Sequence, residues 1–190
     1  MATYAKLPTP KLVKQDTSQF HCWAASLESW IDCARPGTPQ AAMTKTQTEL
    51  IASYKQFTGA KDALLVTKAL FQVMFDFQMM ASVFYPGSQT NGHSIATRLM
   101  TKGYLWMFYF GGALGTNLGH AEVVYGVVNS HGKDAQIRTM DPWTGTLELK
   151  PVTHLQTRSQ VYLCWKDNSP TWSDDMFKIM KMMLKVNGGS

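Results

Sequence analysis

The apolar residues of this 190-residue chain change their spacing about halfway along it. In the first half they recur at intervals of three and four residues, as on one buried face of a helix. In the second half they form short runs rich in aromatic and β-branched residues, separated by glycine and proline, as in strands. Helices followed by strands, rather than alternating with them, predict an α+β fold with an antiparallel sheet.

Four helices and five strands are predicted from this pattern, after an extended arm at residues 1–20. The predicted helices cover residues 22–35, 46–57, 61–77 and 93–102. The predicted strands cover residues 104–110, 120–129, 135–140, 146–151 and 161–166, with a glycine-rich loop at 111–119. The dipeptide Pro36-Gly37, which favours a turn, ends the first helix.

The length of the chain fits one domain with a short extension. We expect a domain over residues 1–170 and a C-terminal extension over residues 171–190. In the extension, apolar and lysine side chains recur on separate stripes from about residue 173 to 186, which predicts a basic amphipathic helix. Such a helix packs on its own domain or docks on a partner, and the sequence leaves both roles open.

The charge and the cysteine content exclude several classes of function. The net charge is +5, but the lysines are scattered and form no dense basic block, so we predict no nucleic-acid partner. The three cysteines include no Cys-x-x-Cys pair and the histidines have no metal-ligand spacing, so we predict no metal ion and no other cofactor. No apolar run of about 18 residues occurs, so we predict no transmembrane segment.

Cys22 lies at the predicted start of the first helix, in the sequence Phe-His-Cys-Trp-Ala-Ala. The N-terminus of a helix carries a partial positive charge and unpaired N–H groups, both of which stabilise a thiolate. The thiolate is the reactive form of cysteine, so this position suits a nucleophile. Taken alone, the residue fits a buried structural cysteine equally well.

Two further motifs lie on either side of a predicted β-hairpin loop near residues 130–133. His120 opens one strand in the sequence Gly-His-Ala-Glu-Val-Val-Tyr-Gly, and Asp141 follows the next strand in Met-Asp-Pro-Trp-Thr-Gly. Because both residues are almost equally far from the loop, we expect them to lie opposite each other on one face. A carboxylate in that place fixes the tautomer of an imidazole base and stabilises its cation. A bulge of one residue would turn the two side chains to opposite faces.

These motifs together carry a family resemblance. Cys-Trp-Ala-Ala after an upstream glutamine, Gly-His-x-x-Val-Val-x-Gly and Asp-Pro-Trp-x-Gly follow one another along the chain. In this order and spacing the chain resembles the papain-like cysteine peptidases. It is similar in particular to the bacterial double-glycine (bacteriocin-processing) peptidases and to the papain-like effector proteases of pathogens. The likeness covers roughly residues 10–166.

The resemblance implies a papain-like α+β fold, in which an N-terminal helical half carrying Cys22 packs on a C-terminal antiparallel sheet. It implies a catalytic triad of Cys22 as the nucleophile, His120 as the base and Asp141 as the group that orients the base. The family's oxyanion-hole glutamine lies six positions before the nucleophile, where this chain has Asp16. We therefore expect Gln15 to take that role.

Three more side chains are assigned by their places next to these motifs. Gln19 is the alternative oxyanion-hole donor, since it also precedes Cys22. Trp23 follows the nucleophile and Trp143 follows the Asp-Pro dipeptide, so we expect them to contact substrate or to shield the site from water. A core position is the alternative for Trp143.

The implied function is that of a thiol protease, a hydrolase that cleaves peptide bonds through an acyl-enzyme. The same triad would also serve an amidase, a deamidase or a transglutaminase. A third interpretation is a binding module that keeps the fold without the chemistry, although all three triad residues are present. The substrate is a protein or a peptide if the first interpretation holds.

The resemblance to effector proteases also suggests where the protein acts. We expect synthesis in a bacterial cytoplasm and delivery without a cleavable signal peptide, because no apolar stretch follows the basic residue near the N-terminus. The protein would then be an effector or toxin domain that acts on a protein of another cell. A toxin of this kind would need a cognate inhibitor or immunity protein.

Overall fold

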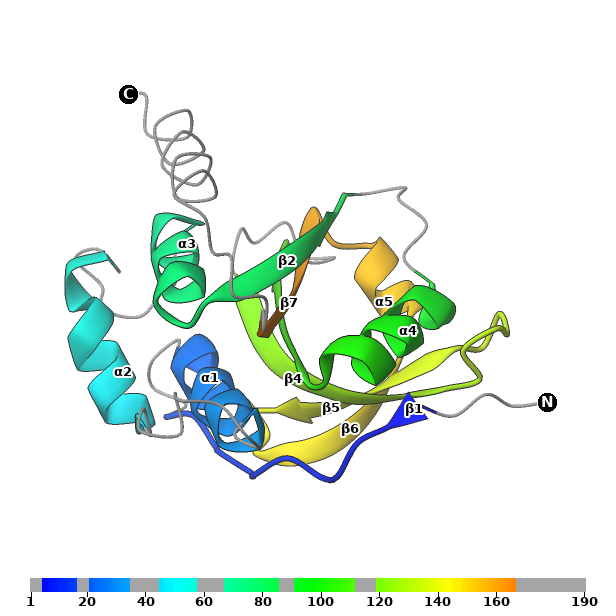
Figure 1. Ribbon diagram of the computed structural model, residues 1–190, viewed down its shortest axis with the longest axis horizontal. Coiled ribbons are helices and arrows are strands. Elements are labelled where there is room, and N and C mark those ends of the chain that lie inside the picture. Colours follow the sequence, from blue (N-terminus) through cyan, green and yellow to red (C-terminus); the bar gives the residue numbers. More distant parts are fainter. Residues whose placement is uncertain are drawn as a thin grey trace.

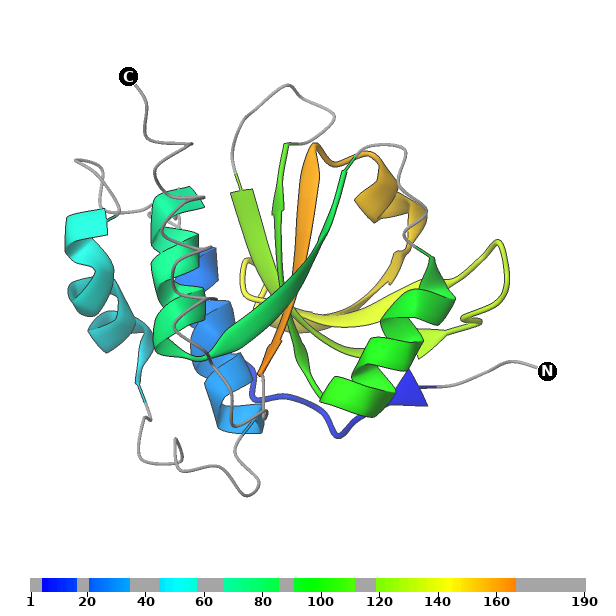
Figure 2. The same ribbon diagram turned by 45° about the horizontal axis from the view of Figure 1, so that its top comes forward.

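A computed structural model describes residues 5–16, 21–34, 45–57, 67–85, 91–111 and 119–166 of the chain (Figure 1). Helices α1 (Cys22–Cys33), α2 (Gln47–Tyr54) and α3 (Thr67–Asp76) lie together on one side of the molecule. Figure 2 shows that a sheet separates these helices from α4 (Gly92–Lys102) and α5 (Thr153–Gln156). Helices of the N-terminal part packed against an antiparallel sheet confirm the predicted α+β fold class.

The sheet contains seven strands among the described residues. Its order is β2-β7-β3-β4-β5-β6, and every neighbouring pair is antiparallel. The strands are β2 (Met79–Phe84), β3 (Leu105–Phe110), β4 (Gly119–Val128), β5 (Gln136–Asp141), β6 (Thr146–Pro151) and β7 (Gln160–Lys166). The short strand β1 (Ala5–Lys6) pairs with the far end of β4, at Gly126 and Val127.

Side chains of this sheet alternate between two separate hydrophobic clusters. On β3, Trp106 and Phe108 join the cluster that contains α1, α2 and α3, whereas Leu105 and Met107 join the cluster under α4. This alternation is the period of two that a strand buried on both faces requires. The sheet is therefore covered by apolar contacts on both faces, and its central strands are almost wholly buried.

Local sequence signals explain where several helices begin. Thr46 caps α2 by accepting a hydrogen bond from the backbone N–H of Glu49, whose carboxylate accepts one from the backbone N–H of Thr46. This reciprocal pair is a capping box, which satisfies two N–H groups that the helix leaves unpaired. Asn91 caps α4 in a similar way through the backbone N–H of Ser94.

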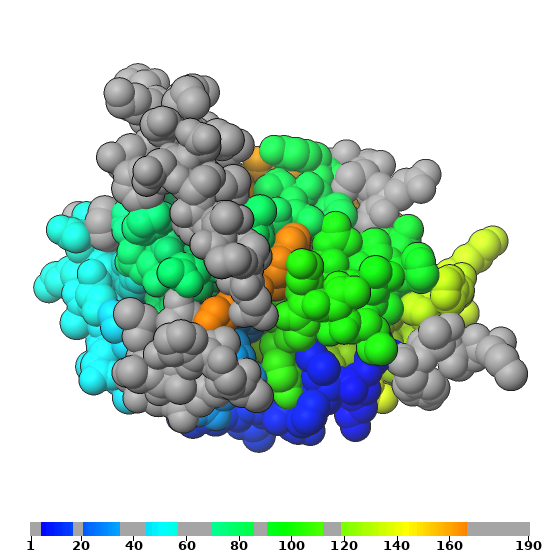
Figure 3. All heavy atoms as spheres, in the orientation of Figure 1, coloured from blue at the N-terminus to red at the C-terminus, as the bar shows by residue number. Residues whose placement is uncertain are grey.

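Residues 7–16 cross the surface from β1 to the helical side of the molecule (Figures 1 and 3). Lys11 forms an ion pair with Glu28 of α1 at 2.8 Å, and its backbone oxygen accepts a hydrogen bond from Ser29. A further hydrogen bond, from the backbone N–H of Gln15 to the oxygen of Pro142, ties this arm to the end of β5. The arm thus joins the helical half to the sheet half.

Most predicted elements occur close to their predicted bounds, and three observed elements were not predicted. These are β1, β2 and the short helix α5. The extension at residues 171–190 and its helix lie outside the described residues, as does most of the glycine-rich loop. Among the described helices, none is both long and apolar enough to cross a membrane.

Candidate active site

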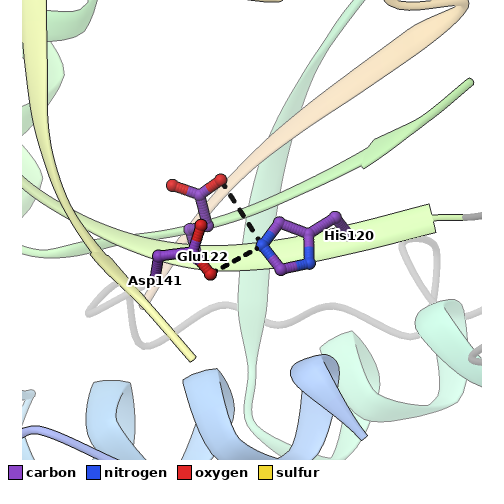
Figure 4. Close-up of side chains that lie close together, drawn as sticks. All are labelled: His120, Glu122 and Asp141. Carbon is purple, nitrogen blue, oxygen red and sulfur yellow. Dashed lines mark hydrogen bonds and ion pairs between the residues drawn. The ribbon is translucent and has the colours of Figure 1, made fainter. Parts of the chain in front are cut away.

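His120 and Asp141 form a hydrogen-bonded pair at the open end of the β4–β5 hairpin. The Nε2 atom of His120 lies 2.9 Å from the Oδ1 atom of Asp141 (Figure 4). Tyr109 lies directly across from His120 on β3, and its ring meets the imidazole edge-on at 5.6 Å. Gly119 leaves room for the neighbouring Phe108 ring, because a Cβ atom there would lie 2.8 Å from that ring.

The register of the hairpin differs from the prediction by two residues. Val123 pairs with Met140, so the next position along places Glu122, rather than His120, opposite Asp141. A shift of two residues keeps a side chain on the same face of the sheet. His120 and Asp141 therefore share a face although they are diagonal neighbours.

A β-bulge between Val124 and Gly126 creates this arrangement. Beyond the bulge Val127 pairs with Ile137, and that register, if continued, would place Asp141 opposite Val123. The side chain of Val123 points into the helical cluster, so Asp141 would face away from His120. The one-residue bulge, which the sequence analysis treated as a risk, is what turns the carboxylate toward the imidazole.

The turn after β5 holds the Asp141 carboxylate in place. Its Oδ1 atom accepts a second hydrogen bond, at 2.8 Å, from the backbone N–H of Trp143. The backbone N–H of Gly145 donates a hydrogen bond to the backbone oxygen of Asp141. Gly145 has a φ of +71°, which glycine adopts without strain. The sequence Asp-Pro-Trp-Thr-Gly thus forms a turn whose first side chain is locked by its own backbone.

Cys22 is the first residue of α1 and lies against the same imidazole. The side chains of Cys22 and His120 are close enough to form a hydrogen bond. Since Nε2 of the ring faces Asp141, Nδ1 is the nitrogen left for the thiol. The first turn of α1 contains no acidic residue, so its partial positive charge remains available to a thiolate.

The surroundings of His120 favour its protonated form. Burial opposes the charge, but hydrogen bonds to Asp141 and Cys22 outweigh burial and raise the pKa of His120 from 6.5 to about 10. Burial likewise opposes ionisation of Asp141. Its hydrogen bonds to His120 and Lys150 nevertheless hold the pKa of that carboxyl well below its usual range. An imidazolium beside an ionised carboxylate is the state that stabilises a neighbouring thiolate.

Glu122 and Lys150 also belong to this site, and the sequence analysis did not assign them. The Oε1 atom of Glu122 lies 3.6 Å from Nε2 of His120, and Lys150 of β6 reaches Asp141 at 2.6 Å. Glu122 follows His120 by two positions in a strand that is otherwise apolar. A carboxylate inside such a strand was the signal that could have identified it, because same-face neighbours are two residues apart.

His120, Glu122 and Asp141 place three potential metal-ligating atoms within 4.8 Å of one another. The ammonium group of Lys150, however, already donates hydrogen bonds to both carboxylates, at 2.9 and 2.6 Å. A lysine cation thus occupies the place where a metal would balance the two negative charges. The predicted absence of a metal ion stays a prediction.

The remaining predicted residues lie at different distances from the chemistry. Gln15 is buried beside the turn that follows Asp141, whereas Gln19 lies outside the described residues. Trp23 is fully buried and packs edge-on against Tyr54 in the helical cluster. Trp143 is 49% exposed, next to Asp141. Their roles toward substrate stay predictions.

A thiol at a helix start, an imidazole in contact with it and a carboxylate behind the imidazole suit nucleophilic acyl transfer. A protein-family model described as papain-like cysteine protease AvrRpt2 matches residues 4–160 of this chain. The matched range includes the helix, the hairpin and the turn that bring these three groups together. A search among curated proteins found no significant match.

Proposed function

The chain belongs to the papain-like cysteine protease AvrRpt2 family and is a cysteine peptidase, and we propose that Cys22, His120 and Asp141 carry out its reaction. The observation that supports this assignment most is the meeting of three side chains from α1, β4 and the end of β5. The family match favours hydrolysis of peptide bonds over the amidase, deamidase and transglutaminase reactions that the same triad could support.

In the first half of the proposed reaction, the Cys22 thiolate attacks the carbonyl carbon of the scissile peptide bond. A bond forms between sulfur and carbon, and the carbonyl oxygen becomes an oxyanion. The Nδ1 proton of the His120 imidazolium then passes to the leaving amine as the carbon–nitrogen bond breaks. The products of this half are a free amine and a thioester on Cys22.

In the second half, His120 accepts a proton from a water molecule through the same nitrogen. The resulting hydroxide attacks the thioester, a carboxylic acid leaves, and the ion pair of Cys22 and His120 is restored. Asp141 keeps Nε2 protonated throughout, so that only Nδ1 exchanges protons. The raised pKa of His120 supports this cycle, because the imidazolium must persist at neutral pH.

For the oxyanion we propose two donors, the side-chain amide of Gln15 and the backbone N–H of Cys22. Gln15 is buried, and its backbone is bonded to Pro142 beside Asp141, which supports a place close to the reacting groups. The N–H of Cys22 lies at the start of α1, where helix N–H groups point out of the helix. Each donor of this kind contributes about 10²–10³ in kcat.

We also propose that the peptidase is an effector or toxin that cleaves a protein of another cell after delivery. The support is the family itself, since its namesake is a pathogen effector. A cognate inhibitor or immunity protein in the producing cell would follow from a toxin role.

The experiment compares the parent protein, Cys22→Ala and Cys33→Ala in a search for new protein N-termini in extracts of candidate target cells. Cys33 lies at the other end of α1 and serves as the matched control. New N-termini are expected with the parent protein and Cys33→Ala, and none with Cys22→Ala. Equal cleavage by Cys22→Ala would refute the assignment of the nucleophile.

A further inference from the structure

Lys150 bridges two carboxylates behind the imidazole of His120. Its Nζ atom donates hydrogen bonds to Oδ2 of Asp141 at 2.6 Å and to Oε1 of Glu122 at 2.9 Å. The side chain comes from the edge strand β6 and is only 15% exposed. An amphipathic lysine that gives up most of its hydration must gain strong partners in return.

Glu122 is the most deeply buried charged residue at this site. Its side chain is fully inaccessible, and Tyr109 donates a hydrogen bond to its Oε1 atom at 2.7 Å. The same oxygen lies 3.6 Å from Nε2 of His120, compared with 2.9 Å for Asp141 (Figure 4). The imidazole thus has two carboxylates within reach of one ring nitrogen, and it is hydrogen-bonded to Asp141.

From this geometry we propose that Lys150 is a positioning residue of the peptidase. It bridges the two buried carboxylates and holds Asp141, rather than Glu122, as the partner of His120. The proposal rests on the catalytic roles proposed above for Cys22, His120 and Asp141. We call His120, Glu122, Asp141 and Lys150 the charge network.

The charge network is balanced as the structure describes it. Two carboxylates face two cations, the Lys150 ammonium and the His120 imidazolium. If the ammonium were removed, two negative charges would remain on one face with oxygen atoms within 4.8 Å of each other. Like charges this close oppose each other's ionisation, so such a pair holds a shared proton to a higher pH than a single carboxylate would. A proton on Asp141 would weaken its hold on the imidazole.

Other charged groups around the charge network do not replace Lys150. Glu148 of β6 adds a further carboxylate, 3.2 Å from the ammonium. Arg158 lies over the ring of Tyr109 at 4.7 Å, and its guanidinium group bonds to His154 of α5 and to the backbone oxygen of Gly111 rather than to Glu122 or Asp141. Cys22 approaches from α1 and adds negative charge as a thiolate. Among the described residues, Lys150 is therefore the cation other than His120 that contacts both carboxylates, and it is hydrogen-bonded to each of them.

The test is a double-mutant cycle on Lys150 and Glu122. Lys150→Met removes the ammonium but keeps an unbranched apolar stem, one atom shorter than lysine. Glu122→Gln removes one carboxylate but keeps an acceptor for Tyr109. The double variant leaves one carboxylate, Asp141, alone with His120. Lys133→Met, in the exposed loop of the same hairpin, is the matched control. Values of kcat and KM are measured from pH 5 to 10 on a peptide that the parent protein cleaves.

Lys150→Met is expected to lose about 10- to 100-fold in kcat at pH 7, less than the loss of a whole acid–base group, with little change in KM. Its activity should rise again with pH, because both carboxylates ionise once the shared proton leaves. The kcat of the double variant at pH 7 should be at least tenfold higher than that of Lys150→Met, and it should lack the added rise with pH. Lys133→Met should match the parent protein.

A double variant that is as inactive as Lys150→Met, or a pH profile unchanged in Lys150→Met, would overturn the proposal. If Lys150→Met alone does not fold, the double variant still tests the proposal, because it contains no unpaired Glu122 charge. A double variant that folds but is inactive refutes the positioning role of Lys150. Iodoacetamide labelling located by mass spectrometry separates the two hypotheses. Parent protein unlabelled at Cys22 would contradict the proposed function, whereas labelled parent with failed rescue contradicts only the role of Lys150.

Discussion

Replacing Asp141 by Asn tests the electrostatics of the site most directly. Oδ1 of Asp141 accepts hydrogen bonds from His120 and Trp143, and Oδ2 accepts one from Lys150. All three partners are donors, so either orientation of an Asn amide turns its NH₂ group toward another donor. The substitution therefore removes a charge and also introduces a clash of donors, while it preserves the size of the side chain.

The magnitude follows from the distance between the two charges. At about 3 Å and an effective dielectric constant of about 20, one charge contributes roughly 5 kcal/mol, which sets an upper limit of about 4 pKa units. Glu122 remains near the ring, so we expect a smaller fall in the pKa of His120, of about 2–3 units from its value of about 10. The catalytic rate should fall by about 10²–10⁴, as expected when a base loses the group that orients it.

The assay is the pH dependence of kcat/KM, together with the titration of the His120 ring followed by NMR. In the parent protein the alkaline limb should lie near pH 10, because the reaction needs the imidazolium and the pKa of His120 is raised to about 10. In Asp141→Asn the limb should move to lower pH. Asp134→Asn, in the exposed loop of the same hairpin, is the control. An unmoved limb with activity within tenfold of the parent would refute this account of the site.

Two further predictions concern the oxyanion and the bulge. Gln15→Ala should lower kcat by about 10²–10³ with little change in KM. The control, Gln156→Ala at an exposed position of α5, should leave kcat unchanged. Equal kinetics of the two variants would rule out Gln15 as an oxyanion donor. Deleting Tyr125, the extra residue of the bulge, removes the bulge but leaves Val123 opposite Met140 and Gly126 opposite Arg138. The variant should therefore have native-like far-UV circular dichroism, keep Asp141 on the face of His120 and retain cleavage. Loss of cleavage in a folded variant would contradict this account of the register.

The three residues of the proposed triad could be singled out from the sequence because each has a local signal. Cys22 opens a helix, His120 opens a strand and Asp141 precedes a proline at the end of another strand, and all three features depend on neighbouring residues alone. Strand β6 was also predicted with its observed bounds, because turn residues flank it on both sides. Short-range patterns of this kind need no knowledge of the rest of the fold.

Features that depend on the pairing between strands could not be predicted from the sequence. The bulge at Tyr125 has one local signal, Gly126 within a run of valines, because an isolated glycine in a strand suggests a bulge. That signal does not say which partner residues pair on either side of the bulge. Only two residues, Phe77 and Gln78, separate α3 from β2, and Gln78 has a φ of +51°. Neither residue is a glycine or a proline that would mark the change in the sequence. Its residues are mostly half-buried, as on an edge strand, and this weakens the alternation that identifies strands.

The charge network could not be predicted from the sequence for a similar reason. Glu122 and Lys150 are 28 positions apart and meet only because β5 pairs with both β4 and β6. In the sequence Lys150 alternates with Leu147 and Leu149, a pattern that ordinarily buries the leucines and leaves the lysine in solvent. The structure instead exposes both leucines and buries most of the lysine. Its burial follows from the register of two strand pairs.

The position of the sheet between two hydrophobic clusters also affects how the site can come apart. Cys22 belongs to the cluster of the helical half, whereas His120 and Asp141 are held by strands. Partial unfolding in proteins proceeds through cooperative units, and packed helices can detach before a sheet separates. Detachment of α1 would separate sulfur from imidazole while the β-ladder stays intact, so loss of cleavage would report the opening of the helical cluster directly.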